Sequence, residues 1–494
     1  MSQDKYKITV VGGGTAGVMS ATYLKSYWGD QVDVTMIYDH SKPGIGVGES
    51  LTPIFDKYLS TVGISTLELI QNCNATIKLG LKFKNWTKQD SEWIHSFPIN
   101  EALDATDPTI SYFNAVDAYD MSIGQYENAY NYDKFYFDNN LIFGADIRTY
   151  RHALHIDANV VGRYIESQFK DKINIVDGIV DNVEVENREI KSITLASGQV
   201  ITSDLFIDAS GLGNAMFKYL DPEWISVEDQ LPTNRTIPNP LFKDFDHIPP
   251  YTTAEATKNG WILDVPLSNR RGTGYVYSSK FTTDEEAKQD FNKWLIKTHD
   301  TELQSDRVIK FSNGYWKEQW IGNCIAIGLS SGFVEPLEAT SLHNTFVQLE
   351  AITGMHTFVK SPHTIKKYNE FSNSIYEDCF EYIRFFYHTN RTDSEFWKYM
   401  TDITPEWLQE LDNKMKHSFV SPRDFRNVIF DSSSYISVGY AHDRYTKEGT
   451  DRYLKSKFLT AQAKIDSQKI KEIKLDVQQY AVDHKEWIDY VKSL

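Results

Sequence analysis

The stretch KITVVGGGTAGVM, residues 7–19, decides the fold of this chain. Lys7–Val11 is a short β-branched run, and the glycines that follow it have the spacing G-x-G-x-x-G. An amphipathic segment then leads from Val18 to about Tyr27, and a second apolar run covers Val32–Tyr38. Strand, glycine loop, helix and strand in this order predict a βαβ unit that binds a dinucleotide.

Each residue of the glycine loop has an expected part in holding a pyrophosphate. Gly12 makes the tight turn, Gly14 lets the backbone approach phosphate, and Gly17 permits close packing of the helix. Thr15 and Ala16 open that helix, whose N-terminus faces the negative charge. We expect all five residues to contact the cofactor.

The carboxylate that usually binds the ribose should lie about 20 residues after the loop. Asp39 lies close to that distance and is the candidate, although Tyr38 then takes the usual acidic position. Gly211-Leu212-Gly213 follows another strand but lacks a third glycine. The sequence therefore predicts one dinucleotide, and if this is FAD, its electrons come from outside the chain.

Composition excludes several classes of function. The 494 residues include 51 Lys and Arg against 68 Asp and Glu, a net charge of −17, which argues against nucleic acid or an anionic membrane as a partner. Cys73, Cys324 and Cys379 are far apart, which indicates a reducing compartment and no metal cluster. There is no signal peptide and no long apolar run, so a cytoplasmic protein is expected.

The remaining segments predict an α/β fold with insertions. Residues 173–200 alternate in short pieces, as a small antiparallel sheet would, and residues 204–211 form a buried strand that ends in small residues. Residues 100–148 are expected to form a surface excursion or lid, and residues 470–491 keep helical spacing. We expect a Rossmann-like, glutathione-reductase-type FAD-binding core with an inserted antiparallel sheet over residues 1–365, and a mostly helical module over residues 366–494.

A second informative stretch is IAIGLSSGFVEPLEATSL, residues 325–342. It predicts an apolar strand, a Gly/Ser loop, two glutamates around a proline, and the start of a helix. Glu335 and Glu338 lie close to buried strand ends, where carboxylates are costly unless they are paired or used. A structural corner with Thr340 as the helix cap explains the same pattern.

Seven segments together resemble the flavin-dependent halogenases of the tryptophan-halogenase type. They are VVGGGTAG at 10–17, GVGES at 46–50, IKLGLKFKNW at 77–86, HIDAN at 155–159, DLFIDASG at 204–211, IGLSSGFVEPLEATS at 327–341 and FFYHTNRTDSEFW at 385–397. The resemblance spans about residues 7–400 and is looser beyond them. A composition rich in Asn and Lys suits a virus-encoded member, such as those of marine phages.

This resemblance implies a cofactor, a second substrate and a partner. The cofactor is FAD, reduced by a separate flavin reductase, and the second substrate is a halide ion. Further cofactor contacts are implied at Gly48, Glu49, Ser50, Asp208, Gly328 and Leu329. Reduced FAD and O2 oxidise halide to hypohalous acid, and Lys78 relays that species, with Glu338, to an electron-rich aromatic of phenol or indole type. Backbone N–H groups at Thr340 and Ser341 are the implied halide contacts.

Each of these residues has a plainer alternative. Lys78 is also explained as a surface lysine with a buried stem, and Glu338 as an acid stabilised by the helix dipole. His95, Phe97 and Pro98 are candidates for the substrate pocket, although the residue pattern alone favours a packed, hydrogen-bonded histidine at His95.

The sequence departs from the family at one signature. The pattern WxWxIP falls on Trp261-Ile262-Leu263-Asp264-Val265-Pro266, so Leu263 replaces the second tryptophan. The signature is associated with keeping organic substrate away from the flavin, and its loss puts tryptophan itself in doubt as the substrate. A flavin monooxygenase on the same fold is the alternative, and a flavin-binding module without activity is a third. The arene, the preferred halide and the oligomeric state, a homo-oligomer included, are left open.

Overall fold

The computed structural model describes most of the chain. The described residues are 5–42, 48–97, 136, 138–143, 152–356, 358, 361–418, 420–421, 423–446, 448–449, 452, 455 and 481–494. Pro98, Gly46 and Val47 lie outside them, as do residues 470–480 of the expected C-terminal helix and most of the expected excursion at 100–148.

Contacts divide the chain into two compact units, each assembled from three segments. The first unit consists of Met1–Ala75, Ile156–Asp229 and Phe311–Tyr376. The second consists of Thr76–His155, Gln230–Lys310 and Glu377–Leu494. This grouping follows contacts rather than chain order, and the expected division into residues 1–365 and 366–494 stays a prediction.

The first unit is built on a six-stranded sheet in the order β21-β22-β13-β1-β2-β9. Its strands are Trp320–Ile321, Cys324–Ala326, Leu205–Asp208, Tyr6–Val11, Val32–Tyr38 and Asn174–Asp177, respectively. β1 pairs in parallel with both β13 and β2, and Val10 lies opposite Ile207 and Met36. Residues 8–11 of β1 and all of β13 are buried, as expected for strands covered on both faces, whereas β2 keeps an exposed Asp33 between Val32 and Val34.

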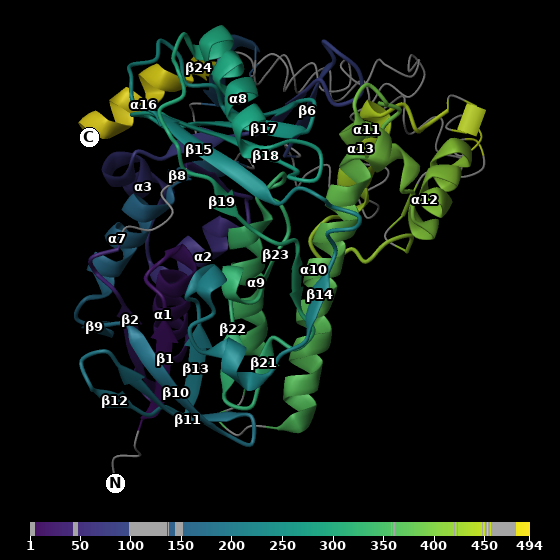
Figure 1. Ribbon diagram of the computed structural model, residues 1–494. Helices are drawn as coiled ribbons and strands as arrows, with labels where there is room; N and C mark the ends of the chain where they lie inside the picture. Colours follow the sequence, from purple (N-terminus) through teal and green to yellow (C-terminus); the bar gives the residue numbers. More distant parts are fainter. Residues whose placement is uncertain are drawn as a thin grey trace. The chain divides into compact units, whose positions relative to one another are not determined.

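Helices and two smaller sheets complete the first unit. The helices are α1 (Thr15–Trp28), α2 (Phe55–Val62), α3 (Thr66–Cys73), α7 (Ala158–Phe169) and α9 (Thr340–Met355), and α1 contacts α2, α7 and α9. The antiparallel strands β10 (Val180–Glu186), β11 (Glu189–Leu195) and β12 (Val200–Ile201) form one sheet, and β14 (Trp224–Ser226), β20 (Gly314–Trp316) and β23 (Gly332–Phe333) form the other. Figure 1 shows α1 running alongside β1 and β2.

The second unit contains a seven-stranded sheet in the order β19-β15-β18-β17-β16-β5-β6. Its strands are Ile309–Lys310, Arg235–Leu241, Arg271–Tyr277, Gly260–Pro266, Tyr251–Ala256, Gly80–Lys84 and Glu92–Ser96, respectively. β4 (Thr76–Lys78) pairs antiparallel with β8 (Ala153–Asp157), and β7 (Leu141–Phe143) pairs with β24 (Ala481–Asp483).

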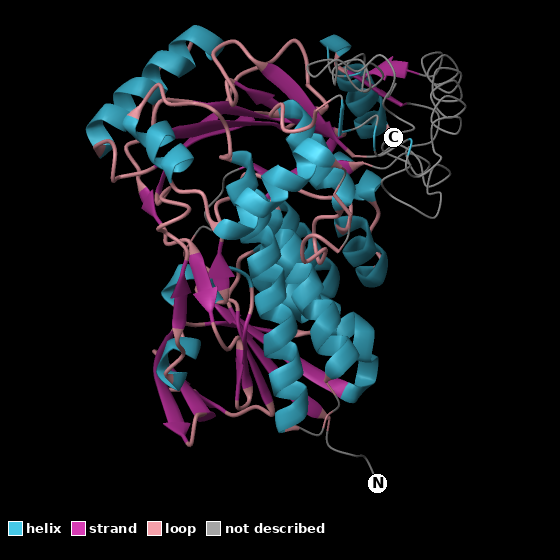
Figure 2. Ribbon diagram, turned by 90° about the vertical axis from the view of Figure 1, so that its right-hand side faces the viewer, coloured by secondary structure: helices cyan, strands magenta, loops and turns pink. Residues whose placement is uncertain are grey.

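The described helices of the second unit are α8 (Asp284–His299), α11 (Glu395–Asp402), α12 (Glu406–His417), α13 (Ser432–Ala441) and α16 (His484–Ser493). α10 (Pro362–Phe386) crosses the boundary between the units. The helices and strands in Figure 2 together make the mixed α/β fold that the sequence predicted.

The sequence located most elements of the first unit. The predicted runs 7–11, 18–27, 32–38 and 204–211 correspond to β1, α1, β2 and β13. Two expectations were partly wrong. Residues 174–177 join the parallel sheet as β9 instead of the small antiparallel one. Ala481, expected in a helix, lies in β24, because it pairs with Phe143.

Candidate functional site

The glycine loop of the first unit has the close backbone contacts that its spacing predicted. Gly12 has a φ of +134°, and a Cβ there would stand 2.1 Å from the carbonyl oxygen of Ala209. A Cβ at Gly17 would stand 2.0 Å from the carbonyl oxygen of Gly12. At Gly14, by contrast, a Cβ would meet nothing within 4 Å. The loop is therefore packed tightly on its protein side and is open at Gly14.

The N-terminus of α1 lacks the usual protein partners. Gly14 is the N-cap residue, it provides no side-chain cap, and the first turn contains no acidic residue. The unpaired N–H groups and the helix dipole favour an anion at this position. The residues present therefore fit the pyrophosphate of a dinucleotide such as FAD.

Gly328, another predicted contact of the cofactor, lies against this loop. A Cβ at Gly328, whose φ is +63°, would stand 2.8 Å from the Cβ of Ala16. Gly328 and Leu329 open a short 3-10 turn, Gly328–Ser330, at the end of β22. The Thr15 hydroxyl donates to the carbonyl of Ala158 at the start of α7, at 3.3 Å. The carboxyl ends of parallel strands are where this fold class binds ligands.

Asp208 is fully buried and holds the neighbouring loops together. Its Oδ1 accepts from the backbone and the hydroxyl of Ser210 at 3.0 and 2.6 Å, and from the Ser330 hydroxyl at 3.2 Å. Its Oδ2 accepts from the backbone N–H groups of Met216 and Phe217, each at 2.8 Å. The structure thus gives Asp208 a positioning role, while a direct contact with cofactor stays a prediction.

The ribose end of the loop differs from the usual dinucleotide site. Tyr38 ends β2, and its ring packs where a Cβ of Gly13 would stand, 2.3 Å from Cγ. Its hydroxyl donates to Glu166 at 2.8 Å and accepts from Arg163. Burial, together with the Glu166 carboxylate, raises the pKa of Tyr38 to about 12, so the hydroxyl remains protonated.

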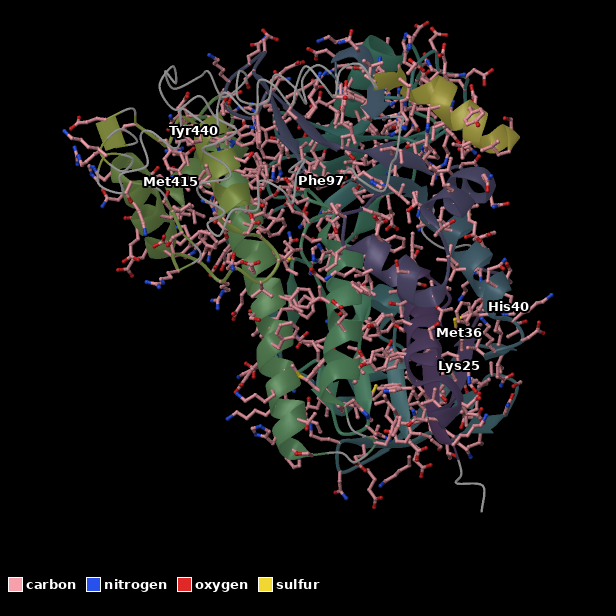
Figure 3. All side chains as sticks on the ribbon, turned by 180° about the vertical axis from the view of Figure 1, so that it is seen from behind. Lys25, Met36, His40, Phe97, Met415 and Tyr440 are labelled. Carbon is pink, nitrogen blue, oxygen red and sulfur yellow. The ribbon has the colours of Figure 1, made fainter. Side chains whose placement is uncertain are left out.

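Asp39, the predicted ribose ligand, is engaged by its own turn. Its Oδ1 accepts from the backbone and the hydroxyl of Ser41 at 3.0 and 2.6 Å, and Lys42 lies 3.4 Å from Oδ2. These hydrogen bonds from Ser41, with Lys42, lower the pKa of Asp39. His40, labelled in Figure 3, lies beside this turn with its ring 4.3 Å from that of Tyr38.

Glu49 and Ser50 follow the second glycine cluster in β3 (Gly48–Ser50). Burial, with a smaller contribution from the Asp157 carboxylate, raises the pKa of Glu49 to about 7. Two residues further on, the Thr52 hydroxyl lies 2.9 Å from Nδ1 of His343 in α9. This hydrogen bond connects the glycine-cluster segment to the helix that follows Glu338.

The helix after Glu338 begins without a side-chain cap. Its N-cap residue is Ala339, with a left-handed backbone at φ 59° and ψ 36°, and not Thr340, which is its first helical residue. The first turn contains no acidic residue, and Thr340 is 1% exposed. Backbone N–H groups at Thr340 and Ser341 therefore suit a small anion.

The two glutamates before this helix are both buried. Glu335 is 0% exposed and Glu338 4% exposed. The backbone N–H of Glu335 donates to the side chain of Asn313 at 2.8 Å, which fixes the loop. A left-handed alanine directly after Glu338 costs backbone energy, and such strain is common at functional sites.

Lys78 lies in the second unit and is fully buried. It ends β4, opposite Ala153 of β8. Its Nζ stands 5.1 Å from the ring centroid of Phe97, a cation–π contact, and the Phe97 side chain is labelled in Figure 3. The surface-lysine alternative is therefore wrong for Lys78, because its ammonium has no exposure to solvent.

A buried histidine shares this strand pair with Lys78. The Thr76 hydroxyl donates to the carbonyl of Pro266 at 2.6 Å, so it accepts from Nδ1 of His155 at 3.0 Å. Nε2 of His155 then accepts from the Thr252 hydroxyl at 3.0 Å. Burial, followed by the nearby Lys78, lowers the pKa of His155 well below its usual value. His155 is thus a neutral histidine with its proton on Nδ1.

The remaining predicted residues of the second unit lie on neighbouring strands. His95 of β6 pairs with Leu81, and its ring centroid is 6.3 Å from that of Tyr382. Leu263 lies in β17, where it pairs with Ala254 of β16 and with Gly274 of β18, and it is partly exposed. The altered signature therefore falls on a strand.

Lys78 and Glu338 belong to different units, so their proximity stays a prediction. Sequence reasoning missed Thr76, Thr252 and the protonation state of His155, since these contacts depend on strand register rather than on a motif. The segment HIDAN, which contains His155, was the one available signal.

Within the described ranges, no group of three or more His, Cys, Asp or Glu side chains is arranged to hold a metal ion. Among the same residues, no helix is long and apolar enough to cross a membrane. Cys73, Cys324 and Cys379 are all buried thiols.

Several known proteins are similar to this chain in sequence. A family model described as tryptophan halogenase matches residues 7–456. Tryptophan 7-halogenase RebH of Lentzea aerocolonigenes is 31% identical over 420 residues, 79% of this chain and 78% of that protein. Tryptophan 6-halogenase SttH of Streptomyces toxytricini is 28% identical over 455 residues, 86% of each protein.

Solved structures match nearly the full chain. The crystal structure of SttH covers 99% of this chain and 100% of its own, with a TM-score of 0.88 at 22% identity. BrvH, a flavin-dependent halogenase from Brevundimonas sp. BAL3, covers 99% of each chain with a TM-score of 0.81 at 22% identity. At these identities the likeness establishes the fold.

Proposed function

Because this chain belongs to the tryptophan-halogenase family of flavin-dependent enzymes, we propose that it halogenates an electron-rich aromatic of phenol or indole type. The observation that carries the proposal is the buried ammonium of Lys78 over the Phe97 ring, beside a neutral histidine. Buried ionisable side chains are concentrated at functional sites, which makes Lys78 a candidate functional group. The viral origin expected from composition stays a prediction.

The first unit is the proposed oxidising half. FAD, reduced by a separate flavin reductase, would supply two electrons and two protons, so that O2, halide and one further proton yield hypohalous acid and water. The glycine loop and the uncapped N-terminus of α1 would hold its pyrophosphate, and Glu49, Ser50, Gly328 and Leu329 would line the flavin side. Backbone N–H groups at Thr340 and Ser341 would bind the halide.

The second unit is the proposed halogenating half. The Lys78 ammonium would donate a hydrogen bond to hypohalous acid and raise the electrophilicity of its halogen, or its amine would form an N–halogen bond. The halogen then replaces a ring hydrogen of the arene, and the hydroxyl oxygen leaves as water. Glu338, which the first unit contributes, would accept the proton that the ring loses.

Membership of the family does not determine which aromatic substrate is halogenated. The relatives act on tryptophan at different carbons, since their names include a 7-halogenase, 6-halogenases and a 5-halogenase. Leu263 replaces a tryptophan of the family signature, and a smaller side chain there favours a wider range of arenes. A cytoplasmic location and a possible second copy of the chain in an oligomer are part of the proposal.

The test is mass spectrometry of a panel of phenols and indoles incubated with the protein, FAD, a flavin reductase, NADH and chloride, bromide or iodide in turn. We expect a mass gain of one halogen minus one hydrogen, dependent on halide and reductase. Gain of one oxygen without halide would instead identify a monooxygenase. No product, with FAD bound and no O2 consumed, would identify a flavin-binding module.

A further inference from the structure

The last helix of the chain reaches the strand that carries Lys78. His484 is the first residue of α16 and is fully buried. Its Nε2 lies 3.1 Å from the backbone nitrogen of Ile77, the residue before Lys78. Ile488 and Val491, on the same face of α16, are also buried, so the helix is docked by an apolar face as well. In Figure 1, α16 lies beside β24 at the end of the chain.

The geometry fixes which nitrogen of His484 carries the proton. The backbone N–H of Ile77 is a donor, so Nε2 of His484 accepts and is unprotonated. Nδ1 therefore carries the proton and donates to the carbonyl of Ile248 at 2.9 Å. The imidazole bridges β4 and the segment that precedes β16, and each of its nitrogens has a partner.

The bridge requires a neutral ring. Burial lowers the pKa of His484 to about 4, so the ring is neutral at ordinary working pH. The charged or titratable groups that face it are Asp483 at the helix N-cap, Arg271 of β18 and His155 of β8. The Ile248 carbonyl and the Asp483 carboxylate favour an imidazolium at His484, but burial outweighs them and keeps the ring neutral.

The other backbone groups around Lys78 are held by hydrogen bonds to neighbouring backbone segments. The N–H of Leu79 donates to the carbonyl of Pro250 at 2.7 Å, and the N–H of Phe97 donates to the carbonyl of Leu79 at 3.0 Å. Lys78 itself is paired with Ala153. On the side of Ile77 that faces away from β8, the imidazole of His484, and not a neighbouring strand, accepts the hydrogen bond from the backbone N–H. A buried N–H without an acceptor is unfavourable, so removal of this imidazole would release the backbone next to Lys78.

We propose that His484 is a positioning residue for Lys78, which the C-terminal helix contributes to the halogenating half of the enzyme. The inference rests on the proposed role of Lys78. It predicts that the chain beyond residue 480 is needed for transfer of halogen to the arene, and not for the reaction of the flavin with O2.

Two substitutions at one position separate the hydrogen bonds from simple packing. His484→Leu removes both hydrogen bonds, whereas His484→Gln keeps an acceptor for Ile77 and a donor for Ile248. Lys492→Met is the matched control, because it removes another contact of α16, the 2.7 Å hydrogen bond from Lys492 to Ser268. Each variant is assayed for halogenated product and for peroxide released per NADH consumed, and for amide hydrogen exchange of the peptide that contains Ile77.

We expect His484→Leu to lower the product yield per NADH about tenfold or more, in line with the cost of a misplaced catalytic group. Peroxide release should rise correspondingly, the Ile77 peptide should exchange faster, and FAD affinity should be unchanged. His484→Gln should restore both product yield and slow exchange, and Lys492→Met should resemble the parent. Should His484→Leu fail to fold, His484→Phe replaces it in the same comparison.

An unchanged product yield in His484→Leu, with faster exchange at Ile77, would overturn the inference. So would a loss of yield that His484→Gln does not restore, because packing rather than hydrogen bonding would then be responsible. Lys78→Ala in the same assay separates the two levels of the argument. If Lys78→Ala keeps its yield, the proposed function of Lys78 fails, whatever His484 does.

Discussion

The Thr76 hydroxyl donates a 2.6 Å hydrogen bond to the carbonyl oxygen of Pro266. This contact joins the strand that ends at Lys78 to the last residue of β17, the strand that contains the altered family signature. It also fixes the proton of His155 on Nδ1, since the hydroxyl has no second hydrogen to donate. One buried hydroxyl therefore positions a strand and fixes the tautomer of the histidine beside the proposed catalytic lysine.

Substitution of Thr76 by valine tests this arrangement. Valine has nearly the same shape but leaves the N–H of His155 and the carbonyl of Pro266 without their partner. We expect the free energy of unfolding to fall by about 1–3 kcal/mol, the usual cost of a buried polar group left unsatisfied. Urea denaturation measures this change, and Thr76→Ser, which keeps the hydroxyl, is the control. Equal losses in both variants would contradict the assigned hydrogen bonds.

The affinity for the adenosine half of FAD should respond to Tyr38. This side chain occupies the position where related dinucleotide sites have a carboxylate for the ribose. We expect Tyr38→Glu to raise the affinity for FAD about tenfold relative to FMN, because a hydrogen bond to a charged acceptor contributes about 1.5–3 kcal/mol. Flavin fluorescence titration measures both constants. With Tyr38→Gln as the uncharged control, an unchanged ratio of FAD to FMN affinity would exclude a ribose contact at this position.

Stability of the flavin-free protein should depend on the protonation of Glu49. Its folded pKa of about 7 lies above the ordinary value of 4.5, so the folded state binds this proton more tightly than the unfolded state does. The resulting stabilisation is complete below about pH 4.5 and is lost as pH rises through 7. Glutamine cannot titrate, so Glu49→Gln does not undergo this loss. The free energy of unfolding of the variant, relative to that of the parent, should therefore be higher at pH 8 than at pH 5 by up to about 3 kcal/mol.

Thermal unfolding of the parent and of Glu49→Gln, measured side by side at pH 5 and pH 8, gives the comparison. Asp157→Asn serves as a second variant, since the Asp157 carboxylate is the smaller cause of the shift. The same difference in Tm at both pH values would show that Glu49 titrates normally.

The features that could be predicted from the sequence are those whose contacts join residues close together along the chain. The glycine loop and its flanking strands could be predicted because their packing is local, and Gly12, Gly14 and Gly17 lie where the motif requires. The burial of Lys78 could not be predicted from its neighbours, since its strand is tied to His155, 79 positions from Thr76, and to His484, 407 positions from Ile77.

The predicted ribose ligand shows the same limit on a smaller scale. Spacing selected Asp39, but the side chain turns back onto Ser41, and the preceding residue forms contacts with α7 instead. The spacing of a motif does not show that a hydroxyl two residues away, here that of Ser41, competes with the ribose for the carboxylate. The replacement at Leu263, in contrast, could be recognised from the sequence, because the whole signature lies in one continuous segment of the chain.

Access of organic substrate should depend on Leu263. If the smaller side chain widens access, Leu263→Trp should narrow the range of arenes that are halogenated and leave FAD binding unchanged. Leu263→Phe, intermediate in size, should give an intermediate range. Competition assays with mixed phenols and indoles, read by mass spectrometry, measure the profile. An identical profile in all three proteins would remove Leu263 from the account of specificity.

The central claim is that the buried Lys78 delivers the halogen, and Lys78→Ala tests it most directly. Halogenated product and released peroxide are measured together, with FAD, reductase, NADH and bromide, and FAD affinity is measured in parallel. The account predicts that product falls to background while FAD binding and peroxide release persist. Halogenation at the parental yield in Lys78→Ala would contradict it.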